Sequence, residues 1–148
     1  MSLKRKMKKG FTLVELVVVI AVIAILAAVS VGAYFGVTES ANRSACEQEA
    51  KAFHTTLLLV ANDPHYDNNA EYGNKTIDVA NGKIDTTYDD AGLKTIFEAV
   101  SGLEYNFVAA AGEETEYVIL ADEATTVTFA SHSKVATIDV ATGTVTIA

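Results

Sequence analysis

A long apolar run near the N-terminus constrains this chain more than any other feature of its sequence. Residues 11–35 are apolar except for Thr12, Glu15, Ser30 and Gly32. As a helix, a run of this length spans roughly 37 Å, and the hydrocarbon core of a bilayer is roughly 30 Å thick. The run is therefore long enough to cross a membrane once. The residues after it are numerous enough to form one small domain.

A basic leader precedes the apolar run, with five cations (Lys4, Arg5, Lys6, Lys8 and Lys9) and no acid. Positive charge on that side keeps the leader in the cytoplasm. Three interpretations follow: a conventional signal peptide cut after the run, near residues 27–33; an uncleaved single-pass anchor; or removal of the leader after Gly10, with the apolar helix kept. Glu15 argues against the first, because a discarded segment needs no carboxylate. Met7 would give a shorter leader with the same junction.

The segment Gly10-Phe11-Thr12-Leu13-Val14-Glu15, with the apolar helix after it, closely resembles the class III signal of type IV pilins and pseudopilins. The resemblance covers residues 4–38 and combines leader charge, Gly-Phe junction, glutamate position and helix length. It implies that a membrane prepilin peptidase cuts between Gly10 and Phe11 and methylates the new amine of Phe11.

Glu15 is the candidate assembly residue. A carboxylate at bilayer depth costs a few kcal/mol on insertion scales, so it is functional by default and needs a partner. After cleavage, the α-amine of Phe11 on a neighbouring subunit could supply the cation, and the resemblance supports this pairing. The alternative is a carboxylate that is protonated or reaches the interface.

Two positions depart from the family pattern. Gly32 stands where relatives usually have proline, two residues before the matched Tyr34, and Ala24 stands where they often have glycine. Cys46 is the only cysteine, so the chain cannot close the C-terminal disulfide of many Gram-negative pilins. The resemblance is therefore to a Gram-positive-type pilin.

Charge and motifs exclude several functions. The net charge is −8, and loss of the leader leaves six basic against nineteen acidic residues, a side-chain balance of −13. This acidity argues against nucleic-acid binding by a lone subunit. The sequence has no catalytic or phosphate-binding motif and no nucleophile–base pattern, so we expect no enzyme activity and no cofactor.

Two weaker signals lie in the polar segments. The loop 62–75 has Asp63, His65, Asp67, Asn69 and Glu71 at alternate positions, but it lacks the glycine and terminal glutamate of a calcium loop. We therefore expect a solvated loop and no metal site. N-glycosylation patterns occur at residues 42–44 and 74–76, and they say nothing about whether modification occurs.

The helix is expected to continue to about residue 61. Apolar residues recur there at helical spacing, which predicts one buried stripe; they are Cys46, Ala50, Phe53, Leu57 and Val60. Asp63-Pro64 ends the helix, since the residue before proline is disfavoured in helical geometry. The predicted organisation is a cleaved leader (1–10), a transmembrane or filament-core helix (11–35), its amphipathic continuation (36–61) and a globular head (62–148), a lollipop of α+β class.

The head is expected to hold a hairpin, a short helix and an antiparallel sheet. Asn81-Gly82 between the β-branched runs 76–79 and 83–86 predicts the hairpin. Asp89 or Asp90 can cap a helix that ends at Gly102, with Leu93, Ile96, Phe97 and Val100 facing a core. Period-two patterns predict strands at 105–109, 116–120, 126–130, 135–140 and 144–147, with a glycine turn at 141–143.

The expected function is that of a structural filament subunit, made as a precursor in the cytoplasmic membrane with its C-terminal domain outside. The resemblance implies a helical homopolymer at the cell surface, with adhesion and motility among its roles. It also implies an assembly ATPase and its membrane platform as partners. The alternatives are a pseudopilin or minor pilin of a secretion or DNA-uptake machine and, from a different class, a membrane-anchored surface binding module.

Overall fold

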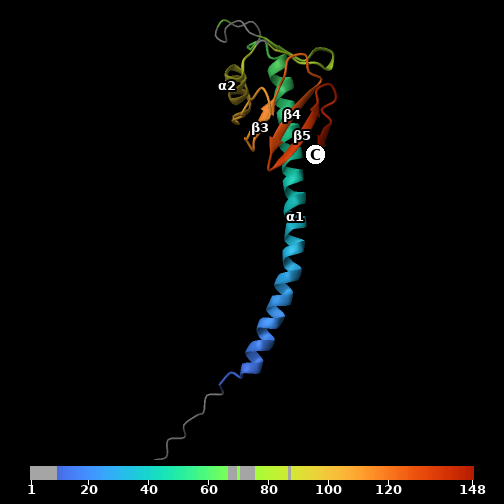
Figure 1. The fold of residues 1–148 in the computed structure, drawn as a ribbon. Coiled ribbons are helices and arrows are strands. Elements are labelled where there is room, and N and C mark those ends of the chain that lie inside the picture. Colours follow the sequence, from blue (N-terminus) through green and yellow to red (C-terminus); the bar gives the residue numbers. More distant parts are fainter. Residues whose placement is uncertain (1–9, 67–69, 71–75, 87) are drawn as a thin grey trace, which may run out of the picture. The chain divides into compact units, whose positions relative to one another are not determined.

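The computed structural model describes residues 10–66, 70, 76–86 and 88–148. Two compact units make up the chain, Met1–Glu39 and Ser40–Ala148. Helix α1 (Leu13–Asn62) contributes to both, and every other helix and strand of the described residues belongs to the second unit (Figure 1).

In the first unit, α1 carries its apolar side chains on every side. The exposed fractions of its large apolar residues run from 46% at Val19 to 78% at Leu13. The hydroxyl groups of Ser30 and Thr38 are satisfied within the helix, since Ser30 Oγ donates to Leu26 O at 2.7 Å and Thr38 Oγ1 to Tyr34 O at 2.9 Å. A helix that is apolar all round needs lipid or other helices around it.

In the second unit, the rest of α1 has the amphipathic character that the sequence predicts. The five residues of the predicted stripe are at most 1% exposed; they are Cys46, Ala50, Phe53, Leu57 and Val60. On another side of the helix, Lys51 Nζ pairs with Glu47 Oε1 at 2.6 Å, one turn apart.

A four-stranded antiparallel sheet packs over this stripe. Its strands are β3 (Tyr117–Ile119), β4 (Thr126–Ser131), β5 (Lys134–Asp139) and β6 (Val145–Ile147), paired in chain order as a meander. Figure 1 shows β4 and β5 crossing in front of α1. The apolar residues that join the helix to the sheet include Val127, Ile138 and Val140, each at most 1% exposed. The α+β prediction, a long helix packed on a small antiparallel sheet, is confirmed.

Phe53 of α1 is the centre of the core. Its ring stacks on Phe97 at a centroid distance of 5.1 Å and meets the edge of Tyr105 at 5.2 Å. Phe129 lies at 5.8 Å and Phe107 at 6.1 Å. Aromatic pairs at such separations add about 0.5–1.5 kcal/mol each beyond burial, so this cluster holds α1, the sheet and helix α2 (Asp90–Ser101) together.

Helix α2 (Asp90–Ser101) has the predicted caps. Asp89 accepts a hydrogen bond from Gly92 N at 2.8 Å, and Gly102, at φ 70°, donates to Glu98 O. Leu93, Ile96 and Phe97 are buried and Val100 is half-buried, as the apolar spacing predicts.

The predicted hairpin forms, but its strands are shorter than expected. Strands β1 (Ile77–Asp78) and β2 (Asp85–Thr86) pair in the register that a two-residue Asn81-Gly82 turn requires. Both turn residues have positive φ, 57° and 72°, as in a type I′ turn. On the side away from β1, Ile84 joins another segment: its N–H donates to Ala124 O and its C=O accepts from Glu123 N.

The prediction of a strand at 105–109 is wrong. This segment forms a single parallel bridge, Phe107 to Val118, in place of an antiparallel strand. The period-two pattern has another cause, because Tyr105 and Phe107 are both buried against Phe53. Alternate side chains are buried here, so the sequence has the period-two pattern of a strand although no antiparallel ladder forms.

Two turns connect the last three strands. The β4–β5 turn places His132 and Ser133 at φ 53° and 59°, a geometry that side chains rarely adopt. The β5–β6 turn uses Gly143 at φ 69°, as predicted. Hydrogen bonds from the hydroxyl and N–H groups of Thr142, at 2.7 and 2.8 Å, tie this turn to Asp139 and lower the pKa of its carboxyl group.

Replacing Gly143 by alanine is expected to destabilise the second unit more than the same change at Gly102. Both glycines have left-handed φ, which costs a side chain about 1–2 kcal/mol. A Cβ at Gly102 meets nothing within 4 Å, whereas at Gly143 it meets the His54 ring at 2.9 Å. That ring is held by a 2.9 Å hydrogen bond to Val140 O. Gly143→Ala should therefore lower the free energy of unfolding by about 1–3 kcal/mol more than Gly102→Ala does.

The measurement is denaturant unfolding of the full chain in detergent, followed by the near-ultraviolet circular dichroism of its tyrosines. Equal losses of unfolding free energy in Gly143→Ala and Gly102→Ala would show that the contact with His54 carries no cost.

Candidate functional site

The predicted processing junction lies just before the first helix. Gly10 and Phe11 have no regular secondary structure, and both are exposed, Phe11 to 76%. Helix α1 begins two residues later, at Leu13. The peptide bond between Gly10 and Phe11 thus lies in accessible backbone outside the helix, where a peptidase can reach it.

Thr12 and Glu15 form a capping box at the start of α1. Glu15 Oε2 accepts from Thr12 N at 2.9 Å and from Thr12 Oγ1 at 2.7 Å. In return, Glu15 N donates to Thr12 Oγ1 at 3.3 Å. This reciprocal pattern satisfies two backbone donors that a helix N-terminus leaves unpaired. It also places a negative charge at the positive end of the helix dipole.

The capping box uses one of the two carboxylate oxygens of Glu15. Both bonds from Thr12 go to Oε2, and among the described residues none goes to Oε1. An ionised carboxylate has about four acceptor positions. Glu15 can therefore cap its own helix and still accept from a cation such as the α-amine of a neighbouring chain.

The helix after the capping box has the length and composition of a membrane span. Nothing in the described residues covers its apolar side chains, which leaves Leu16, Ile20 and Ile23 all more than half exposed. Glu15 is the only charged residue between Phe11 and Phe35. The site is thus one carboxylate at the end of an uncovered apolar helix.

Thr12 was not predicted as a site residue. The sequence contains the signal for it, because Thr-x-x-Glu before an apolar run is a capping-box pattern.

The other candidate features remain outside this site. Cys46 is fully buried, and burial raises the pKa of its thiol, which keeps it protonated and unreactive. Within the described residues, no three His, Cys, Asp or Glu side chains are placed to hold a metal. Asp67, Asn69 and Glu71 of the predicted loop lie outside the described residues. Of the glycosylation patterns, Asn42 lies within α1 and Asn74 is outside the described residues.

Comparison with models of protein families finds a match at the N-terminus. Residues 5–31 match the family model described as the prokaryotic N-terminal methylation motif. A search of curated proteins and a search of solved structures each found no match. The matched residues include the junction, the capping box and most of the exposed apolar helix.

The chain therefore carries the class III signal typical of type IV pilins and pseudopilins, and it has their architecture of a long N-terminal helix packed on a small antiparallel sheet. Proteins that carry this signal, the pilins and pseudopilins, are structural and non-enzymatic. Its motif implies a membrane-anchored precursor that is processed by a prepilin peptidase and handled by an assembly machinery.

Proposed function

We propose that the chain is the main structural subunit of a type IV pilus-like filament at the cell surface. In this proposal it is cut between Gly10 and Phe11, methylated at Phe11, and polymerised through residues 11–35. The observation that carries it is a helix, within a methylation motif, whose apolar side chains have no cover among the residues that the structure describes. Helices of other subunits would supply that cover.

We assign the register of assembly to Glu15. Entry of a subunit into the bundle would bring its Phe11 amine to the free Oε1 of the preceding subunit's Glu15. Oppositely charged groups attract strongly where water is excluded, so a misplaced subunit would leave both charges unpaired. The cleaved leader, an ATPase and its membrane platform complete this proposed pathway, and adhesion and motility are the roles implied for a long filament.

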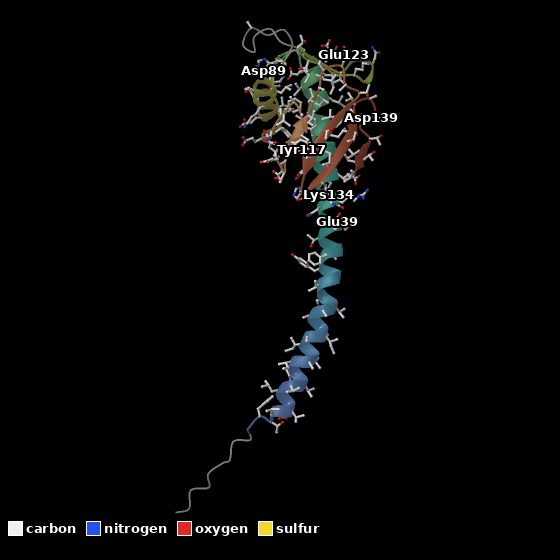
Figure 2. All side chains as sticks on the ribbon, viewed as in Figure 1. Glu39, Asp89, Tyr117, Glu123, Lys134 and Asp139 are labelled. Carbon is white, nitrogen blue, oxygen red and sulfur yellow. The ribbon has the colours of Figure 1, made fainter. Side chains whose placement is uncertain are left out.

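The acidic second unit suits the outside of such a filament. Charged side chains such as Asp89 and Glu123 lie at its surface (Figure 2). Net negative charge keeps protein surfaces soluble and disfavours contact with nucleic acid. The single buried cysteine leaves this unit without an intrachain disulfide, which supports the proposed Gram-positive-type subclass.

The test is to shear fibres from cells that carry or lack this chain and to image the fraction. A main subunit gives abundant long fibres that contain the chain and vanish without it. Short, scarce fibres would favour a pseudopilin or minor pilin. Abundant chain in the membrane with none in the sheared fraction would identify an anchored surface module.

Within the filament, we expect α1 to stay helical between Ala24 and Tyr34. In the structure, α1 continues unbroken through Gly32. Proline in a helix interior costs about 3 kcal/mol against alanine, whereas glycine costs about 1 kcal/mol and keeps its N–H donor. A filament map is the measurement. An extended stretch between Ala24 and Gly32 would show that packing between subunits, and not proline, melts this segment.

A further inference from the structure

One edge of the four-stranded sheet is covered and the other is open. At the β3 edge, Val118 N donates to Asn106 O at 2.8 Å and Val118 O accepts from Val108 N at 3.0 Å. At the opposite edge lies β6, the last strand of the sheet (Figure 1). A second chain that adds to this sheet therefore has to add at β6.

The register of β6 shows which of its backbone groups are unused. Two backbone hydrogen bonds join the ends of this segment to β5: Asp139 N donates to Thr144 O, and Ala148 N donates to Val135 O. Thr146 lies between these two bonds and is opposite Thr137 of β5. Backbone groups alternate between the two sides of an antiparallel strand. The N–H and C=O groups of Val145 and Ile147 therefore point away from β5, and they have no partner among the described residues.

Apart from its short length of three residues, this open edge lacks the features that usually prevent pairing. Exposed edges are commonly protected by charged residues, proline or bulges. Residues 144–148 read Thr-Val-Thr-Ile-Ala and contain none of these. In a chain as acidic as this one, such an uncharged strip is where a second copy can approach without repulsion.

We propose that β6 is a docking edge for the β6 strand of a second copy of this chain. Antiparallel pairing centred on Thr146 places Val145 opposite Ile147 of the second copy, with their free N–H and C=O groups exchanged. The face pattern is self-complementary. On the exposed face, Thr146 lies opposite Thr146 of the second copy. On the other face, Val145 is half-buried and Ile147 is buried against the core, so pairing joins the apolar faces of the two sheets.

This contact is two-fold, so it closes a pair and cannot be the repeating contact of a filament. It joins subunits that belong to different filaments or are free. Four backbone hydrogen bonds do not offset the entropy lost when two free molecules associate, so the pairing is weak in dilute solution. Many copies side by side along two filaments would raise the effective concentration.

The test is amide hydrogen exchange of the full-length chain in detergent, measured from dilute to millimolar concentration. The amides of Val145 and Ile147 should exchange fast when dilute and slow by about tenfold or more as pairs form, since exchange requires opening of the bond. The amide of Thr146, which faces β5, reports whether the strand itself stays folded. Exchange at Val145 and Ile147 that does not depend on concentration overturns the proposal.

Two lysine variants provide a matched comparison. Thr146→Lys places like charges opposite each other at the centre of the pair, and should weaken pairing by about tenfold. Thr137→Lys puts the same charge on the same exposed face one strand further in, and should leave pairing unchanged. Equal effects of the two variants would overturn the β6 contact. Because the test needs no polymerisation, its failure is distinct from failure of the proposed filament function.

Discussion

Cells that make only the Glu15→Ala variant are expected to form almost no fibres. The change would leave the Phe11 amine of each incoming subunit without its proposed partner in a water-poor bundle. Removing one partner of a buried charge pair costs about 3–5 kcal/mol, which is more than about a hundredfold in an equilibrium constant. Membrane insertion should be intact or improved, because an expensive charge is gone. The measurement is the amount of the chain in sheared fibres and in membranes.

Two further variants separate the charge of Glu15 from its capping role. Glu15→Gln keeps an oxygen that can accept from Thr12 N and removes the charge, so it should lose fibres as alanine does. Thr12→Val removes the hydroxyl of the capping box and keeps the carboxylate. It should cost about 0.5–2 kcal/mol of helix stability and leave most fibres. Normal yield from Glu15→Gln, or complete loss from Thr12→Val, would assign the residue to capping instead of assembly.

Replacing Gly10 by phenylalanine is expected to leave nearly all of the chain as full-length precursor in the membrane. The scissile bond follows Gly10, and a residue with no side chain lets a peptidase approach the backbone closely. A bulky ring there would block that approach, whereas the apolar helix would still insert. Immunoblots of membrane and sheared fractions measure precursor and mature chain.

Gly10→Ala is the matched control for this variant. A Cβ at Gly10 meets nothing within 4 Å in the chain, so neither substitution disturbs the fold. Alanine adds one methyl group and should retain more cleavage than phenylalanine. Full cleavage of Gly10→Phe would mean that the peptidase does not read this position.

Much of the second unit could be predicted from local patterns. The stripe from Cys46 to Val60 and the caps of α2 at Asp89 and Gly102 depend on residues a few positions apart, and all are present in the structure. The turn at Gly143 was predictable for the same reason, since a left-handed position after a strand favours glycine.

Features set by distant partners were not predictable. The backbone of Ile84, just before β2, bonds to Glu123 and Ala124, about forty residues along the chain, and no local pattern indicates this pairing. Tyr105 and Phe107 alternate because Phe53 buries them, not because they lie in a strand. The turn at His132 and Ser133 has no glycine or asparagine to indicate its positive φ.

At the candidate site, the motif predicted the residues and not their geometry. Gly10, Phe11 and Glu15 follow from the sequence pattern, and the family model matches the same segment. The Thr-x-x-Glu pattern also signals the capping bonds between Thr12 and Glu15, but not that both bonds from Thr12 go to Oε2 and leave Oε1 unused. Their roles in processing and assembly remain proposals, because those roles depend on a peptidase and on neighbouring chains.

The most direct test of the central proposal is the mass of the N-terminal peptide of the chain purified from sheared surface fibres. The proposal predicts a peptide that begins at Phe11 and carries one added methyl group on its amine, with the whole apolar helix after it. A peptide that begins after Ala27, or one that retains the basic leader, would contradict it.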